Sequence, residues 1–178
     1  MTVCAVFALS ASAVSADPIV VNSGGNNVTG TIVAGNGTVT ITLNNNLTNA
    51  QVLAITNNIS AVYFQVSGYN LAAVGLSASN SVASTTIAGG GAATLGAGFN
   101  PTGWAAGHSG STVTVCDICA FGIGGSAGPA NTIIGGTGTG TYANANGSIA
   151  GNGPHNPFLA GTVVFTLTVP GVTVNSTF

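Results

Sequence analysis

Gly37-Thr38-Val39-Thr40-Ile41-Thr42-Leu43 is the stretch of sequence that decides the fold. Its threonines alternate with aliphatic residues, so a β-strand places the threonines on one face and Val39, Ile41 and Leu43 on the other. This alternation is typical of an antiparallel strand with one face in the core and one in solvent. Residues Gly161 to Val169 repeat the pattern with a threonine-rich outer face.

Shorter strand candidates are separated by turns rich in Gly, Asn and Pro. They cover residues 28–33, 60–67, 81–87, 111–115 and 130–134. Ser60 to Ser67 is apolar on both faces, which predicts a more central strand. Asn49 to Thr56 is the one stretch expected to form a helical turn or two.

The strand pattern predicts an all-β fold, an antiparallel β-sandwich of jelly-roll-like type in a single domain. A mature chain of roughly 160 residues is long enough for one real core. A β-solenoid is the competing architecture, because Gly, Asn, Thr and Ser also dominate those folds. No fixed repeat period supports it.

Ionisable side chains are nearly absent. The 178 residues contain no Lys, no Arg, two His, and Asp17 and Asp117 as the only acids. Phosphate backbones and anionic lipid surfaces are held by cationic side chains, so nucleic acid and anionic membranes are excluded as partners. Acid–base catalysis normally draws on His, Asp, Glu, Lys or Tyr, and of these the chain has only two His, two Asp and three Tyr. We therefore expect a non-catalytic protein without cofactor or metal.

Met1 to Ala16 has the character of a secretory signal peptide. An apolar run is followed by small residues, and Val14-Ser15-Ala16 fits a cleavage site before Asp17. The usual basic n-region is absent, so either the start lies upstream or the signal is atypical; the alternative is a buried N-terminal strand or helix. We expect residues 17–178 to form the exported domain, with a C-terminus that is truncated. Cleavage would remove Cys4 and leave an even pair of cysteines.

Cys116-Asp117-Ile118-Cys119 is the most distinctive local motif. We predict a disulfide between Cys116 and Cys119 that closes a tight loop after a strand. A redox-active pair is an alternative, but the following Gly-rich residues do not start the helix that such pairs require. A zinc site that adds His108 and His155 is a third reading, at spacing far longer than that of a zinc finger.

Two further motifs carry candidate chemistry. Gly124-Gly125-Ser126-Ala127-Gly128 matches G-x-S-x-G, but Pro129 follows where a hydrolase elbow needs a helix. A triad with Asp117 and His155 would also have an unusual chain order. Trp104, together with Phe99 and Tyr142, could offer an uncharged platform on which a sugar ring stacks; a Trp in the core is the simpler interpretation.

Residues 141–159, TYANANGSIAGNGPHNPFL, followed by 164–172, VFTLTVPGV, resemble the ectodomain ending of bacterial PEP-CTERM sorting-signal proteins. In that family an exosortase processes a C-terminal anchor, which here would have to follow Phe178. The resemblance implies export in bacteria that produce exopolysaccharide and form biofilms. It supplies no catalytic residues.

Together these observations predict a non-catalytic, exported bacterial protein of the cell surface or extracellular matrix. Exopolysaccharide is one expected partner. Self-association is another, because strand edges lack the charges that usually prevent edge-to-edge pairing. A carbohydrate-binding module that uses Trp104 is the alternative. A hydrolase that uses Ser126, or a redox enzyme that uses the cysteine pair, is a more remote alternative.

Overall fold

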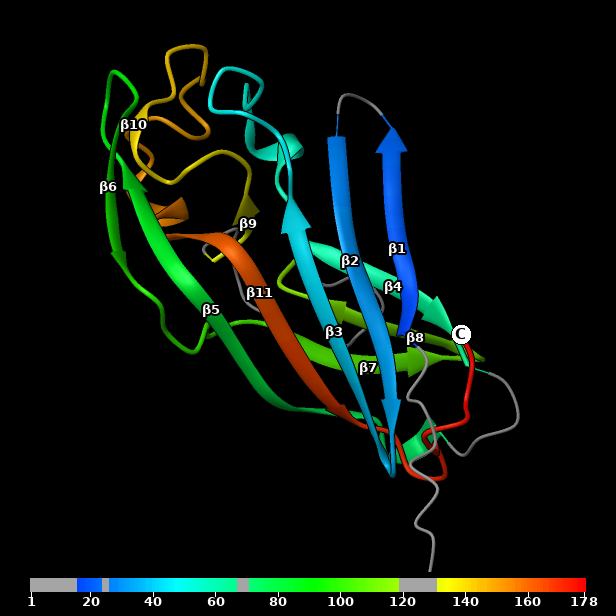
Figure 1. Ribbon diagram of the computed structural model, residues 1–178. Helices are drawn as coiled ribbons and strands as arrows, with labels where there is room; N and C mark the ends of the chain where they lie inside the picture. Colours follow the sequence, from blue (N-terminus) through cyan, green and yellow to red (C-terminus); the bar gives the residue numbers. More distant parts are fainter. Residues whose placement is uncertain (1–15, 24–25, 67–70, 119–130) are drawn as a thin grey trace, which may run out of the picture.

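The computed structural model describes residues 16–23, 26–66, 71–118 and 131–178, and for residues 19–23 and 26 the backbone alone. Over these ranges the chain is built mostly of strands, and two sheets pack against each other (Figure 1). The predicted all-β, sandwich-like single domain is confirmed. None of the helical segments in these ranges is long and apolar enough to cross a membrane.

The larger sheet has the strand order β1-β2-β3-β11-β5-β6-β10, with β9 paired in parallel to β11. Its strands are β1 (Ala16–Ser23), β2 (Asn26–Gly35), β3 (Thr38–Asn45), β5 (Gly75–Ile87), β6 (Ala92–Ala97), β9 (Ile133–Ile134), β10 (Gly140–Thr141) and β11 (Phe158–Thr168). Because β11 lies between β3 and β5, distant parts of the sequence are brought together, as a solenoid would not do.

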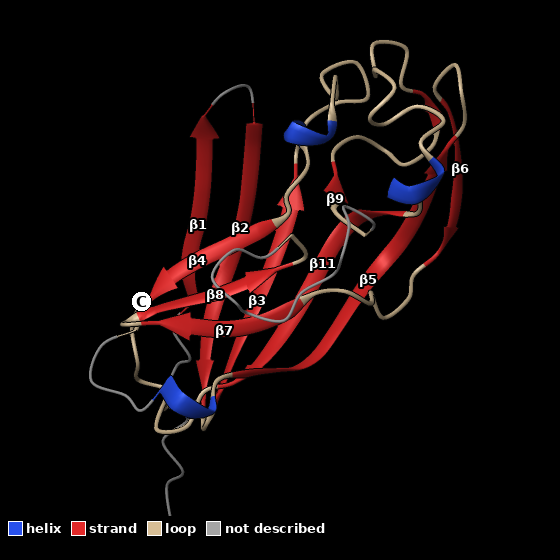
Figure 2. Cartoon of the chain, turned by 180° about the vertical axis from the view of Figure 1, so that it is seen from behind, coloured by secondary structure: helices blue, strands red, loops and turns tan. Residues whose placement is uncertain are grey.

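The smaller sheet has the order β4-β8-β7, from β4 (Ala61–Gln65), β8 (Thr112–Cys116) and β7 (Ala105–Ser109). Its strands run across the direction of β1 and β2 of the larger sheet (Figure 2). Short 3-10 turns, η1 (Ile55–Asn57), η2 (Leu71–Ala73) and η3 (Gly153–His155), connect the strands.

The deciding stretch is strand β3, and its alternation is confirmed. Val39, Ile41 and Leu43 are fully buried, whereas the intervening threonines are partly exposed. Strand β11 continues the pattern, and Phe165 lies opposite Ile41 in the antiparallel register. Two neighbouring strands therefore present one apolar face to the core, which is what the period-two sequence requires.

A bulge interrupts β11. The register with β5 shifts between Ala160 and Val163, where Gly161 has a φ of 71°. Glycine adopts this left-handed conformation without steric cost, and bulges commonly use it. Before the bulge the two faces of β11 serve different core clusters, with Phe158 and Ala160 in one and Leu159 in the other, and after the bulge Phe165 belongs to the cluster of Leu159.

The first cluster fills the space between the sheets. It includes the inward residues of β3 and β11, together with Phe64, Trp104, Val113 and Val115. The second cluster lies where the β3–β4 and β10–β11 connections meet the larger sheet. Its buried members are Leu47, Val52, Ile87, Ile134, Tyr142, Ile149, Phe158 and Ala160.

The structure corrects several local expectations. Strand β4, within the stretch predicted to be central, is an edge strand, because β8 occupies the middle of the smaller sheet. Residues 49–54 form a turn and irregular backbone, and the single 3-10 turn η1 starts only at Ile55. The sequence analysis missed β1, β6, β7 and β10; β6 and β7 are rich in Ala and Gly, which carry little β-propensity.

Candidate functional site

Trp104 is a core residue, and the sugar-stacking role considered for it is wrong. Its side chain is only 6% exposed, and its ring centroid lies 4.5 Å from that of Phe165. The indole Nε1 donates a hydrogen bond of 2.8 Å to the carbonyl oxygen of Asn131. A sugar cannot reach a ring whose face and polar edge are both occupied.

The other two aromatics considered for that platform do not join it. Phe99 packs partly buried against the first core cluster, whereas Tyr142 belongs to the second. The Tyr142 hydroxyl donates to Gly135 O at 2.9 Å and accepts from Gly138 N at 3.1 Å. Burial raises the pKa of Tyr142, against the opposing effect of the Gly138 hydrogen bond. Tyr142 therefore has a structural role in the core.

Cys116 ends strand β8, is fully buried and is disulfide-bonded. Its predicted partner, Cys119, lies outside the described residues, so the pairing stays a prediction. The G-x-S-x-G motif with Ser126 and the signal segment up to residue 15 also lie outside them. Their predicted roles are neither supported nor contradicted by the fold.

The two histidines occupy different elements. His108 is exposed on β7, with Nδ1 3.4 Å from Gly110 O. His155 is in η3, with Nδ1 2.6 Å from Ser148 O. In the part of the chain that the structure describes, no three His, Cys, Asp or Glu residues come together. Cys116 and the two histidines are thus not brought into one ligand set.

Asp117 has an unusual environment that the sequence analysis missed. Its side chain is fully buried, and neither carboxylate oxygen has a hydrogen-bond partner. Its backbone N–H donates to Ser60 O at 2.9 Å. Burial raises the pKa of Asp117 from 3.8 to about 7. With no Lys or Arg in the sequence, neither cationic side chain exists to offset the cost of burying this charge.

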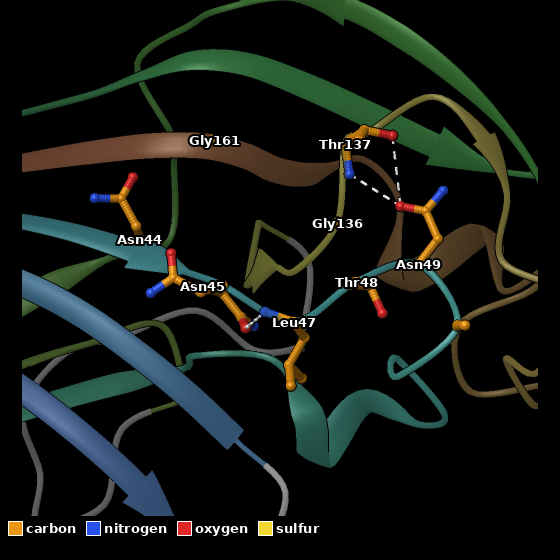
Figure 3. Close-up of a pocket in the computed structure, with 10 residues that line it drawn as sticks. Asn44, Asn45, Leu47, Thr48, Asn49, Gly136, Thr137 and Gly161 are labelled. Atoms are coloured by element: carbon orange, nitrogen blue, oxygen red, sulfur yellow. Dashed lines mark hydrogen bonds between the residues drawn. The ribbon is translucent and has the colours of Figure 1, made fainter.

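An asparagine-rich cavity of about 550 Å³ opens where β3 ends (Figure 3). Its lining comprises residues 44–50, Gly136, Thr137 and, from the β11 bulge, Gly161. Asn49 binds the 137–139 segment at both ends: Nδ2 donates to Thr139 O at 2.7 Å, and Oδ1 accepts from Thr137 N at 2.9 Å.

Asn45 also forms hydrogen bonds to backbone groups of neighbouring segments. Its Nδ2 donates to Asn57 O at 2.9 Å and to Ile133 O at 3.2 Å, and its Oδ1 accepts from Leu47 N at 3.4 Å. The amide groups of Asn45 and Asn49 therefore satisfy backbone groups of neighbouring loops. This arrangement holds the connections in place and leaves these amides little capacity for a ligand.

A second cavity, of about 530 Å³, lies between the larger sheet and the edge strand β4. Val28 and Leu43 line it from β2 and β3. The other side is formed by residues 57–60, residues 61–63 of β4, and Ile118, which follows β8. Tyr63 and Ile118 are 54% and 48% exposed. Asn58, only 8% exposed, donates from Nδ2 to Thr132 Oγ1 at 3.0 Å, while its Oδ1 has no partner.

Sequence reasoning missed Tyr63 and Asn58 as site residues. The apolar character of residues 60–67 suggested a strand buried on both faces, which hid the exposed tyrosine. Asn58 lies in an Asn-rich stretch in which no single amide stands out.

The fold and its cavities define a class of protein: an all-β sandwich domain in which the two cavities described above are lined by uncharged residues. No protein-family model, curated protein or solved structure matches the chain.

Proposed function

We propose that this chain is a non-catalytic, exported bacterial protein of the cell surface or extracellular matrix. The proposal rests on the chemistry of the side chains that line the cavities. Both cavities described above are lined by amides, hydroxyls and apolar groups, in a chain with no Lys or Arg and two carboxylic acids. Such a surface can hydrogen-bond and pack against neutral partners, but it offers few groups that move protons.

Two features of the sequence support export. Met1 to Ala16 has the composition of a secretory signal, and residues 141–159 and 164–172 resemble the ectodomain ending of PEP-CTERM proteins. The buried, disulfide-bonded Cys116 adds support, because structural disulfides persist mainly in oxidising compartments.

The test is to locate the protein in a bacterium that produces exopolysaccharide and carries the native gene. Cells are separated into cytosol, envelope, loosely held matrix and medium, with a cytosolic enzyme as the leakage control. We expect the chain in the matrix or on the surface, with an N-terminus at Asp17. A chain confined to the cytosol with Met1 intact would contradict the proposal.

A further inference from the structure

Unlike the asparagine-rich cavity, the cavity beside β4 is lined by an exposed aromatic ring, that of Tyr63, and by an amide with an unpartnered oxygen, that of Asn58. We propose that it binds a neutral sugar unit of a polysaccharide, with Tyr63 as the stacking surface and Asn58 as the hydrogen-bonding anchor. This inference rests on the proposed function. It names the class of partner, a neutral polysaccharide, and the site on the protein that binds it.

Asn58 supplies the first argument. The side chain is more than nine-tenths buried, and its hydrogen bond to Thr132 Oγ1 fixes the plane of the amide. Oδ1 at the other end has no partner and almost no accessible surface, so a ligand hydroxyl reaches it only after the lining of the cavity shifts. If the amide were turned over, Nδ2 would be left without a partner instead. A ligand hydroxyl both donates and accepts, so it satisfies Asn58 in either orientation.

Tyr63 supplies the second argument. Five large apolar side chains are exposed among the described residues, and Tyr63 is the one aromatic in that group. Tyr63 and Ile118 line the same cavity, whereas Leu53, Val82 and Leu95 do not line it. An exposed aromatic ring beside hydrogen-bonding groups suits a pyranose, which has an apolar C–H face and a polar rim.

The charge of the lining and the volume of the cavity restrict the class of ligand that it can bind. No ionised side chain lines the cavity, and the whole chain has no Lys or Arg to pair with a phosphate, sulfate or uronate group. Asp117 precedes Ile118 in the chain but is fully buried, so it presents no charge at the rim. A volume of about 530 Å³ lies within the usual range for small-ligand sites. These features favour an uncharged sugar.

The experiment is an NMR titration of the purified, oxidised protein with cellobiose, maltose and chitobiose, and with digalacturonic acid as the charged comparison. We expect saturable shifts of the Asn58 side-chain amide and the Tyr63 ring with at least one neutral disaccharide. Tyr63→Ala should weaken binding about tenfold. Tyr63→Trp should restore it, and Leu95→Ala, an equally exposed truncation on β6, should leave it unchanged.

Several results would overturn the inference. These are no shift at about 10 mM of any neutral disaccharide, binding that survives Tyr63→Ala, tighter binding of the acidic sugar, or shifts of the same residues on raising protein concentration alone. The last result would assign the cavity to a second copy of the chain. Cell fractionation does not depend on sugar binding, so an exported protein that binds no sugar refutes this inference while the proposed function stands.

Discussion

The ring of Trp104 lies 4.5 Å from the ring of Phe165, centroid to centroid, with an angle of 37° between the planes. This contact joins the segment before β7 to the central strand β11, so it links the two sheets. The hydrogen bond from Trp104 Nε1 to Asn131 O adds the segment before β9 to the same junction. Trp104 is therefore a structural link between parts of the chain that are far apart in sequence.

Trp104→Ala is expected to lower the free energy of unfolding by about 3–5 kcal/mol, the usual cost of removing a large buried aromatic. Trp104→Phe keeps most of the packing and loses the hydrogen bond, so it should cost less. Urea denaturation followed by circular dichroism measures both. Equal stability of Trp104→Ala and the wild-type protein would show that the ring does not pack in the core.

The alternation of β3 and β11 could be read directly from the sequence, because each strand has one face in the core and one in solvent. The same logic failed for β4. An edge strand can carry apolar residues on both faces when a cavity or a loop lies beside it, so periodicity does not reveal its position in the sheet. Sheet order depends on long-range pairing, which the local sequence does not encode.

The candidate site was harder still to predict. From the sequence, Asp117 was considered only as a member of a catalytic triad, and Asn58 was not singled out. What distinguishes both residues is a buried side-chain oxygen without a hydrogen-bond partner, which a sequence does not reveal. That property arises only after Ile133 pairs with Ile59 and Asp117 N–H binds Ser60 O. Only the folded chain brings these groups together.

Asn49 is expected to stabilise the 137–139 segment through its two backbone hydrogen bonds. Asn49→Ala should cost about 1–3 kcal/mol, because two backbone groups lose their partner. Hydrogen exchange at the Thr137 amide should speed up more than exchange in β3. Asn46→Ala, which removes an exposed side-chain contact with Thr29, is the matched control and should have little effect.

Gly161 should resist substitution. Gly161→Ala would place a side chain at a φ of 71°, with its Cβ 2.9 Å from Val82 Cγ2. We expect a loss of about 1–2 kcal/mol in the free energy of unfolding. At Gly147 an added Cβ meets nothing within 4 Å, so Gly147→Ala should be close to neutral. Equal thermal midpoints for the two variants would argue against the bulge.

The disulfide at Cys116 can be assigned by mass spectrometry of unreduced peptides, which should show a link to Cys119. A loop this short contributes about 2 kcal/mol in the chain-entropy model. Replacing both cysteines with serine should therefore lower stability by about that amount. A link from Cys116 to Cys4 instead would mean that residues 1–16 are retained.

Asp117 makes the stability of the domain depend on pH. Well below pH 3.8 the carboxyl is protonated in both the folded and the unfolded chain. As the pH rises, the unfolded chain ionises at the ordinary pKa of 3.8, whereas burial holds the pKa of Asp117 in the folded state at about 7. The unfolded state therefore binds fewer protons throughout this window, and the free energy of unfolding must fall with rising pH.

Asp117→Asn is expected to abolish this decline, because a neutral amide replaces the acid at every pH. The measurement is the free energy of unfolding from urea titrations at intervals between about pH 3 and pH 8. Near pH 3 the variant should be close to the wild-type protein, and near pH 8 it should be the more stable of the two. Asp17→Asn, which removes the other carboxyl group, should retain the decline caused by Asp117. A wild-type stability that rises from pH 4 to pH 7 would mean that the folded protein stabilises the Asp117 carboxylate.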